Sequence, residues 1–341
     1  MNAAPLGFGV VGTGAIATDF VRALAHAKRS RVLGVCGSTP DKARAFAKEH
    51  GLPLAEPSLD ALVQRPEIQA IYVATPHSLH EPHATLAIEA GKHVLCEKPL
   101  AVDAAAAERV IEAARRRGTF LMEALMYRCH PLMQALVKEL RAGTIGQVSH
   151  VRADFGFRTR RLPDSRLFNP ALGGGAILDV GCYPLSLVRL IAGVISGGEI
   201  AEPETLRGTG FVGPTGVEEV ASASLRFASG MTAEVACALR QELGPRVVIF
   251  GEHGRLILPD PWLPTGERQG RATTLVVHLE NRPPQGIEVR APSPSYALEA
   301  DLVAETLPAQ EAPWPAMSWA DSLGNMRALD AWRAAALTST R

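Results

Sequence analysis

The sequence predicts an α/β protein: a doubly wound parallel sheet, followed by an α+β domain built on one large, open-faced, mostly antiparallel sheet. Three observations support this fold class. Apolar strands alternate with helices of about 10–15 residues in the first part of the chain. A glycine-rich turn, GTG, follows the first strand. After about residue 127, short strands succeed one another through hairpin-like joints such as ASG and EHG. We therefore expect two domains, residues 1–126 and 127–341.

The first domain follows from apolar runs that alternate with helical periods. Right-handed crossovers between parallel strands make such a sheet doubly wound. Gly51 and Gly91 lie just past two of the helices, where glycine commonly ends a helix. The expected strands are 7–12, 31–36, 70–75, 93–96 and 119–126, and the expected helices are 14–28, 41–51, 59–68, 80–91 and 101–118.

The second domain is predicted from a change of period after the first. Alternating apolar and polar residues indicate strands with one buried face. Pro-rich stretches near 259–264 and 292–294 predict surface loops. The expected helices are 131–143, 176–193, 296–307 and 319–337, and the expected strands are 146–157, 218–228, 231–240, 246–252, 254–259, 273–280 and 286–292.

Composition and charge argue against several classes of partner. The 341 residues carry a formal net charge of +0 and have a pI of about 7.2, so no electrostatic field favours nucleic acid or an anionic membrane. We expect no apolar stretch as long as a membrane span. The five cysteines are scattered without metal-ligand spacing. We therefore expect reduced thiols, no metal site and a cytoplasmic location.

The glycine-rich turn predicts a dinucleotide site. It has the pattern G-x-G-x-x-A between a strand and a helix, in which the first glycine allows the tight turn and the second lets backbone approach a pyrophosphate. The helix N-terminus then favours the anion. A plain tight turn in a flavodoxin-like domain is the alternative. The residues assigned to the cofactor are Gly12, Thr13, Gly14, Ala15 and Ile16, with Ala17 keeping helix and sheet close.

The end of the second strand favours NADP over NAD. An acidic residue there accepts a hydrogen bond from the ribose 2′-hydroxyl in NAD sites, and this chain has none before Asp41. Ser38 and Thr39 can donate to a 2′-phosphate, and Lys42 adds positive charge. Alternatively, Asp41 only caps the next helix.

The stretch HVLCEKPLA, residues 93–101, places two charged side chains at the end of a buried strand. Glu97 and Lys98 are costly to bury unless they are paired or used, and Pro99 ends the strand because it has no N–H. Ligands of doubly wound sheets bind at the carboxyl ends of the strands. The alternative is a Glu–Lys pair that closes a strand end.

Five stretches together resemble the glucose–fructose oxidoreductase/inositol dehydrogenase (Gfo/Idh/MocA) family. The resemblance implies a Rossmann domain plus an open-faced sheet domain, NAD(P)-linked oxidation of a hydroxyl on a carbohydrate-like substrate, and a homodimer or higher oligomer. It also implies that Lys98 lies beside the nicotinamide and the substrate, and that the Lys98–Pro99 bond is cis. The matching stretches are GTGAIA, ATPHSLH (74–80), AGKHVLCEKPLA (90–101), EALMYRCHP (123–131) and GGGAILDVGCYP (173–184).

Asp179 and Tyr183 are the further catalytic candidates. They lie four apart, which puts both on one face if the segment is helical, although Pro184 interrupts a regular helix. Many members of the family carry Asp-x-Gly-x-His; this chain has Asp-Val-Gly-Cys-Tyr and resembles the dihydrodiol and xylose dehydrogenase-like members. Tyr183 is the expected general acid/base, Lys98 its electrostatic partner, and Asp179 an acceptor that orients a substrate hydroxyl. The alternatives are a core tyrosine and a helix cap.

Other candidates line the same expected sites. Arg128 either contacts substrate or forms a structural ion pair. Trp262 either stacks on a sugar ring or packs. The arginines at 158, 160, 161 and 166 either touch a polar substrate or lie in solvent. The resemblance implies that the loop after the strand at 70–75 passes the cofactor with Thr75, Pro76 and His77, and that His80 matches a histidine of that loop; alternatively His80 is structural.

An NADP-dependent oxidoreductase acting on a sugar, polyol or vicinal diol is the favoured function. One alternative is a non-catalytic regulatory protein of the same fold, against which the presence of both Lys98 and Tyr183 argues. Another is an oxidoreductase that keeps its cofactor bound and cycles it between two sugars. Fold alone does not decide among them.

Overall fold

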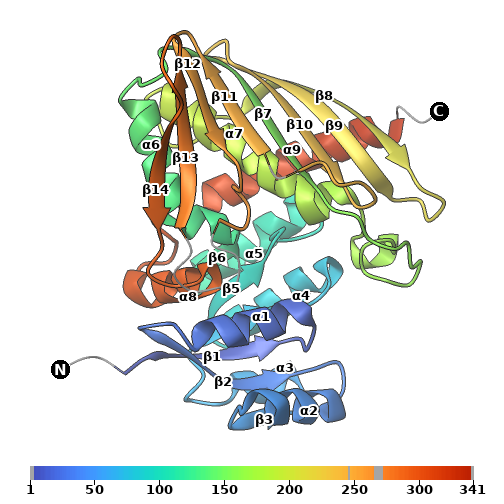
Figure 1. Ribbon diagram of the computed structural model, residues 1–341. Coiled ribbons are helices and arrows are strands. Elements are labelled where there is room, and N and C mark those ends of the chain that lie inside the picture. The colour runs from blue at the N-terminus through green and yellow to red at the C-terminus, as the bar shows by residue number, and fades with distance from the viewer. Residues whose placement is uncertain (1–3, 245, 265–271, 339–341) are drawn as a thin grey trace. The chain divides into compact units, whose positions relative to one another are not determined.

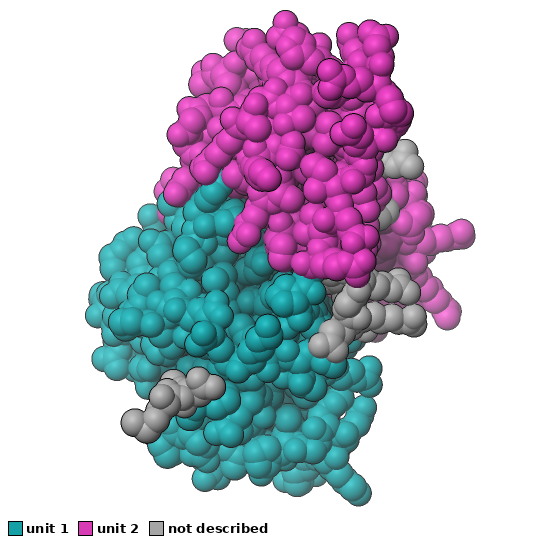
Figure 2. Space-filling view, turned by 60° about the vertical axis from the view of Figure 1, so that its left-hand side comes forward, with its two compact units in different colours: residues 1–129, 265–270, 291–322 teal, residues 130–264, 271–290, 323–341 magenta. Residues whose placement is uncertain are grey.

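The computed structural model describes residues 4–244, 246–264 and 272–338. The chain forms two compact units, coloured separately in Figure 2. Unit 1 comprises residues 4–129 and 291–322 of the described chain. Unit 2 comprises residues 130–264, 272–290 and 323–338, again within the described chain.

Unit 1 is built on a six-stranded parallel sheet of order β3-β2-β1-β4-β5-β6. Strands β2 and β3 are added on one side of β1, and β4, β5 and β6 are added on its other side. Ligands of doubly wound folds bind at the point between β1 and β4 where the order of strand addition reverses. All six strands point the same way, so the residues that follow them gather at one edge (Figure 1). The strands are β1 (Leu6–Val11), β2 (Ser30–Cys36), β3 (Leu54–Glu56), β4 (Ala70–Val73), β5 (His93–Glu97) and β6 (Leu121–Ala124).

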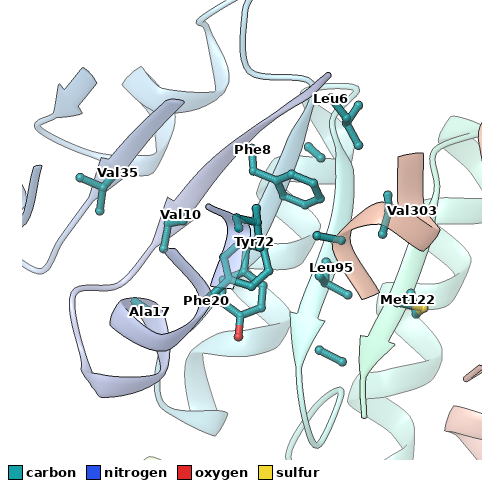
Figure 3. Packing of buried hydrophobic residues seen from close by; sticks show 14 of the residues in the cluster. Leu6, Phe8, Val10, Ala17, Phe20, Val35, Tyr72, Leu95, Met122 and Val303 are labelled. Carbon is teal, nitrogen blue, oxygen red and sulfur yellow. The ribbon is translucent and has the colours of Figure 1, made fainter. Parts of the chain in front are cut away.

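The helices of unit 1 bury apolar faces against this sheet, and α8 from the C-terminal part joins them. Figure 3 shows Val303 of α8 in the same cluster as Leu95 of β5 and Met122 of β6. The helices are α1 (Ala15–Leu24), α2 (Pro40–His50), α3 (Leu59–Val63), α4 (His80–Glu89), α5 (Ala104–Arg117) and α8 (Ser295–Thr306), with short turns η1 (His77–Leu79) and η2 (Met126–Cys129).

Unit 2 is built on an eight-stranded sheet of order β14-β13-β12-β11-β7-β10-β9-β8. Only the β7–β10 pair is parallel; the other neighbours are antiparallel. The strands are β7 (Val148–Gly156), β8 (Pro203–Val212), β9 (Glu218–Phe227), β10 (Thr232–Ala238), β11 (Arg246–Gly251), β12 (Gly254–Leu258), β13 (Ala272–Leu279) and β14 (Gln285–Arg290).

Helices cover one face of this sheet (Figure 1). Strands β9 and β10 also carry exposed polar side chains, such as those of Ser224 and Glu234. The helical elements are α6 (Pro131–Arg141), η3 (Pro170–Leu172), a π-helical turn η4 (Ile177–Gly181), α7 (Cys182–Ile195) and α9 (Trp319–Thr338), whose first four residues belong to unit 1.

One helical run corrects the expectation that no stretch is long and apolar enough for a membrane span. Residues Pro170–Ile195 meet that test by length and composition, with a mean hydropathy of 1.6. The apolar window is 100% buried inside the fold. Helices at the centre of a core reach such a composition because every face is covered.

The fold class expected from the sequence is confirmed, with two differences in detail. The short strand β3 and the edge strand β8 were not expected. The unit boundary also differs from a single division at residue 126. Residues 291–322 pack with unit 1, because Ala300, Val303 and Ala316 complete the apolar cluster on its sheet.

Candidate active site

The glycine-rich turn lies at the carboxyl end of β1. Gly12 has φ +118, and a Cβ there would lie 2.5 Å from the carbonyl oxygen of Ala74, so only glycine fits. Gly14 caps α1, and apart from its own neighbours in the chain no described atom lies within 4 Å of the position its Cβ would take. The protein's own packing therefore does not require a glycine at position 14. The open space beside it suits the close approach of a pyrophosphate to the backbone.

The end of β2 carries hydroxyls and a cation. Lys42 Nζ donates to Ser38 Oγ at 3.2 Å, and both residues are exposed. Thr39, not Asp41, caps α2: its hydroxyl accepts from the Lys42 amide at 3.3 Å. Asp41 instead pairs with Arg44. A ribose 2′-phosphate would meet donors here rather than an unpaired carboxylate.

The ends of β4 and β5 are joined through His80. Its ring nitrogens lie 2.9 Å from the carbonyl oxygen of Thr75 and 2.8 Å from that of Pro99. Burial lowers the pKa of His80 to about 4, so the imidazole is neutral at pH 7 and donates through one nitrogen. His77 is also buried and packs edge-on to this ring, and Pro76 lies between these residues in the chain.

Glu97 and Lys98 stand where the sequence placed them, at the carboxyl edge of the parallel sheet. Glu97 is buried, accepts from the Tyr72 hydroxyl, and accepts from the Lys98 amide at 3.2 Å. The Lys98–Pro99 bond is cis, as expected. Tyr72 was not singled out from the sequence, because its apolar neighbours in β4 made it look like an ordinary core residue.

Glu123 of β6 is a second residue that sequence reasoning missed. It is buried beside β5 and accepts from the Leu100 amide at 3.0 Å. The available signal was a carboxylate inside the apolar run TFLMEALM. Charged residues are rarely buried without a partner.

In unit 2, Asp179 lies in the π-helical turn η4, where the chain departs from the regular α-helix assumed in the spacing argument. Such turns often occur at functional sites. Arg166 Nη1 donates to Asp179 Oδ1 at 2.8 Å. Glu218 also contacts this turn, because its carboxylate accepts a hydrogen bond from the Ile177 amide at 3.2 Å. Burial raises the pKa of Glu218.

Tyr183 follows in α7 and belongs to a cluster of aromatic rings. Phe155 lies edge-on to Tyr183 at 5.1 Å between ring centroids, and Trp262 lies at 5.9 Å from each of the two rings. Trp262 is 1% exposed and donates to the Asp154 carbonyl oxygen at 3.0 Å. Trp262 therefore packs against other rings, which is one of the two interpretations offered by the sequence. The loop at 259–264, expected to be a surface connection, places this buried side chain against β7.

Two arginines considered for substrate contact have protein partners. Arg128 is buried in unit 1 and pairs with Asp321 of the same unit at 2.7 Å. Arg161 forms two hydrogen bonds with Glu219, at 2.5 and 2.6 Å. Within the described part of the chain, no group of three His, Cys, Asp or Glu residues is arranged to hold a metal ion.

Comparison with protein families matches both parts of the chain. Residues 6–125 match the GFO_IDH_MocA oxidoreductase family with an NAD-binding Rossmann fold, and residues 133–257 match the GFO/IDH/MocA C-terminal domain. Trans-1,2-dihydrobenzene-1,2-diol dehydrogenase of Mus musculus is 34% identical over 271 residues, which are 77% of this chain and 79% of that protein.

Solved structures match over nearly the whole chain. A 3-ketoreductase from Actinomadura kijaniata, in complex with NADP and TDP-benzene, has a TM-score of 0.86 at 27% identity and covers 97% of this chain and 98% of its own. An aldose-aldose oxidoreductase from Caulobacter crescentus, complexed with glycerol, has a TM-score of 0.85 at 28% identity and covers 99% and 98%.

Proposed function

This chain belongs to the GFO/IDH/MocA oxidoreductase family, and from that premise we propose that it transfers a hydride between NADP and the hydroxyl or carbonyl carbon of a sugar, a polyol or a vicinal diol. The names of its relatives support this substrate class, since they include a dihydrodiol dehydrogenase, a 3-ketoreductase and an aldose-aldose oxidoreductase.

The observation that carries the proposal is the space left by Gly14 at the N-terminus of α1. A Cβ there would meet nothing beyond its own neighbours in the chain, which leaves room for a pyrophosphate to approach the backbone. The hydroxyl of Ser38 and the ammonium of Lys42 at the end of β2 support NADP over NAD. NADP, when bound, supplies or accepts the hydride.

Tyr183 is assigned the proton transfer. A phenol, with a reference pKa of about 10, is a poor base unless a cation favours the phenolate. Lys98 is assigned that electrostatic role, and Asp179 is assigned to accept a hydrogen bond from a substrate hydroxyl. The ion pair with Arg166 supports this role, because it orients the carboxylate of Asp179.

A second candidate function is the transfer of hydride between two sugars through a cofactor that stays bound. The likeness to an aldose-aldose oxidoreductase favours it. Under this function, nucleotide absorbance stays with the protein through gel filtration and needs no added NADP.

We also propose that two copies pair through the open face of the eight-stranded sheet. On the covered face Val247, Ile249 and Leu256 are buried. Their neighbours on the opposite face include a row of half-buried apolar residues across three adjacent strands, Val248, Ile257 and Val276. An apolar patch of this kind is commonly an interaction surface. Light scattering that gives a monomer mass would refute the dimer.

The compartment is proposed to be the cytoplasm. All five cysteines are free thiols, and four of them are buried. Thiols are kept reduced in that compartment. Fractionation of cells that produce the tagged chain tests this location.

Nucleotide binding tests the proposed function. Quenching of protein fluorescence compares NADPH with NADH on wild type, Gly14→Val and Lys98→Ala, with the exposed Lys48→Ala as control. We expect tighter binding of NADPH and at least a tenfold loss in Gly14→Val. Lys98→Ala should bind NADPH but fail to reduce sugar-derived ketones. If neither nucleotide binds wild type, the glycine-turn argument fails.

A further inference from the structure

The turn that carries Lys98 is held by a carboxylate from the neighbouring strand. Glu123 lies beside Cys96 in the β5–β6 ladder and is 2% exposed. Its Oε1 accepts from the Leu100 amide at 3.0 Å, while Oε2 has no hydrogen-bond partner among the described residues. The hydrogen bond from the Leu100 amide to Glu123 therefore fixes the turn at the residue after Pro99.

Two further side chains, those of Glu97 and His80, contact the same turn. The Lys98 amide donates to Glu97, and the Pro99 carbonyl oxygen lies 2.8 Å from the His80 ring. His80 is neutral at pH 7, because burial lowers its pKa to about 4. Glu123 differs from His80 because it accepts from the turn and can do so with a full negative charge, and a hydrogen bond to an ionised group is stronger than one between neutral groups.

We propose that Glu123 is a positioning residue for the reaction at Lys98: its ionised carboxylate fixes the Lys98–Pro99–Leu100 turn, and protonation of that carboxylate loosens it. This inference rests on the proposed function, because it takes Lys98 to act at the reacting centre. In this proposal Glu123 acts on Lys98 through the Leu100 amide and is given no contact of its own with substrate or cofactor.

The charges around Glu123 place its titration within the working pH range. The pKa of Glu123 is raised to about 7, chiefly by burial and in smaller part by the negative charge of Asp321. The Ser322 hydroxyl, the Leu100 amide and the Arg128 guanidinium act in the opposite direction. Cys96 also faces it from β5, as a thiol whose pKa is raised by burial. Glu123 is therefore ionised above about pH 7 and neutral below.

The experiment compares the pH profiles of wild type, Glu123→Gln and Ser322→Ala. NADP-dependent oxidation of D-xylose and of trans-cyclohexane-1,2-diol is followed from about pH 5.5 to about pH 9. This range includes the ionisation of Glu123 near pH 7. The amide of Glu123→Gln is a neutral acceptor at every pH. We expect wild-type kcat to exceed that of the variant about fivefold at high pH and to converge on it at low pH. Nucleotide Kd stays unchanged.

Two further variants keep the test decisive. Removing the hydroxyl that favours ionised Glu123, in Ser322→Ala, should move the midpoint of the wild-type profile to higher pH. Glu56→Gln is the control, since Glu56 is a buried carboxylate of the same unit that pairs with Arg65 instead of contacting the turn. Its profile should match wild type.

Hydrogen exchange of the Leu100 amide tests the same contact without turnover. The quantity compared is the protection factor, which corrects the observed exchange rate for the intrinsic pH dependence. We expect the protection factor of wild type to rise between about pH 6 and 8, as Glu123 ionises, and that of Glu123→Gln to stay constant. A constant kcat ratio across pH, or equal protection in both proteins, overturns the inference. If wild type fails to turn over either probe, the proposed substrate class fails, and the exchange measurement alone decides the role of Glu123.

Discussion

Replacing Arg128 with methionine tests whether this arginine holds unit 1 together. Its guanidinium pairs with Asp321 at 2.7 Å, and the two side chains are 0% and 1% exposed. Nε also donates to the Pro315 carbonyl oxygen at 2.7 Å. Methionine keeps the apolar stem but leaves the carboxylate of Asp321 buried without its cation. Removing one partner of such a pair costs about 3–5 kcal/mol.

The assay is urea unfolding followed by tryptophan fluorescence and circular dichroism. With an m-value of about 2–3 kcal/mol per molar urea, the midpoint for unit 1 falls by about 1–2 M. Adding Asp321→Asn removes the unpaired charge and should recover part of the loss. Arg44→Met is the control: it breaks an exposed pair in the same unit, so it should cost less than about 1 kcal/mol.

The reasoning about Arg128 is refuted by one pattern of results. If Arg128→Met leaves the unfolding midpoint unchanged and raises KM for the substrate instead, the arginine contacts substrate. The buried ion pair then contributes nothing measurable to the free energy of unfolding.

Two further predictions concern unit 2. Arg166→Leu removes the cation that orients Asp179. Because the Arg166 side chain is about half exposed, we expect only about a fivefold rise in the KM for substrate, with unchanged NADPH binding. An equal rise in Arg160→Leu, a variant of the same loop, would contradict this role of Arg166. His130 caps α6 by accepting from the Leu132 amide, and burial lowers its pKa to about 4. Its folded-state pKa lies below the unfolded value of about 6.5, so it contributes stability above pH 6.5 that is lost as pH falls through 4. Asparagine can keep the cap without titrating, so His130→Asn should lose about 3 kcal/mol less than wild type between pH 7 and 4 in urea titrations; identical losses would show that His130 is not the group that charges.

The sequence by itself determined the features that depend on local pattern. The alternation of strands and helices, the turn at Gly12 and Gly14, and the position of Lys98 just after a buried strand all follow from short stretches of chain. Parallel strands bring their carboxyl ends to one edge, so the cofactor candidates at 12–16 and 75–80 were expected together without coordinates.

Tertiary structure decided the features that depend on distant partners. Strand β8 contains two glycines and few apolar residues, and it forms because it pairs with β9, with Trp332 of α9 packed against Gly208. Arg128 finds Asp321 at 193 positions along the chain, which no local pattern can predict. The same holds for Glu123, since its anchoring of Leu100 exists only when β5 and β6 lie side by side. The role of a buried charged side chain depends on the partner that the fold places beside it, and that partner can be distant in the sequence.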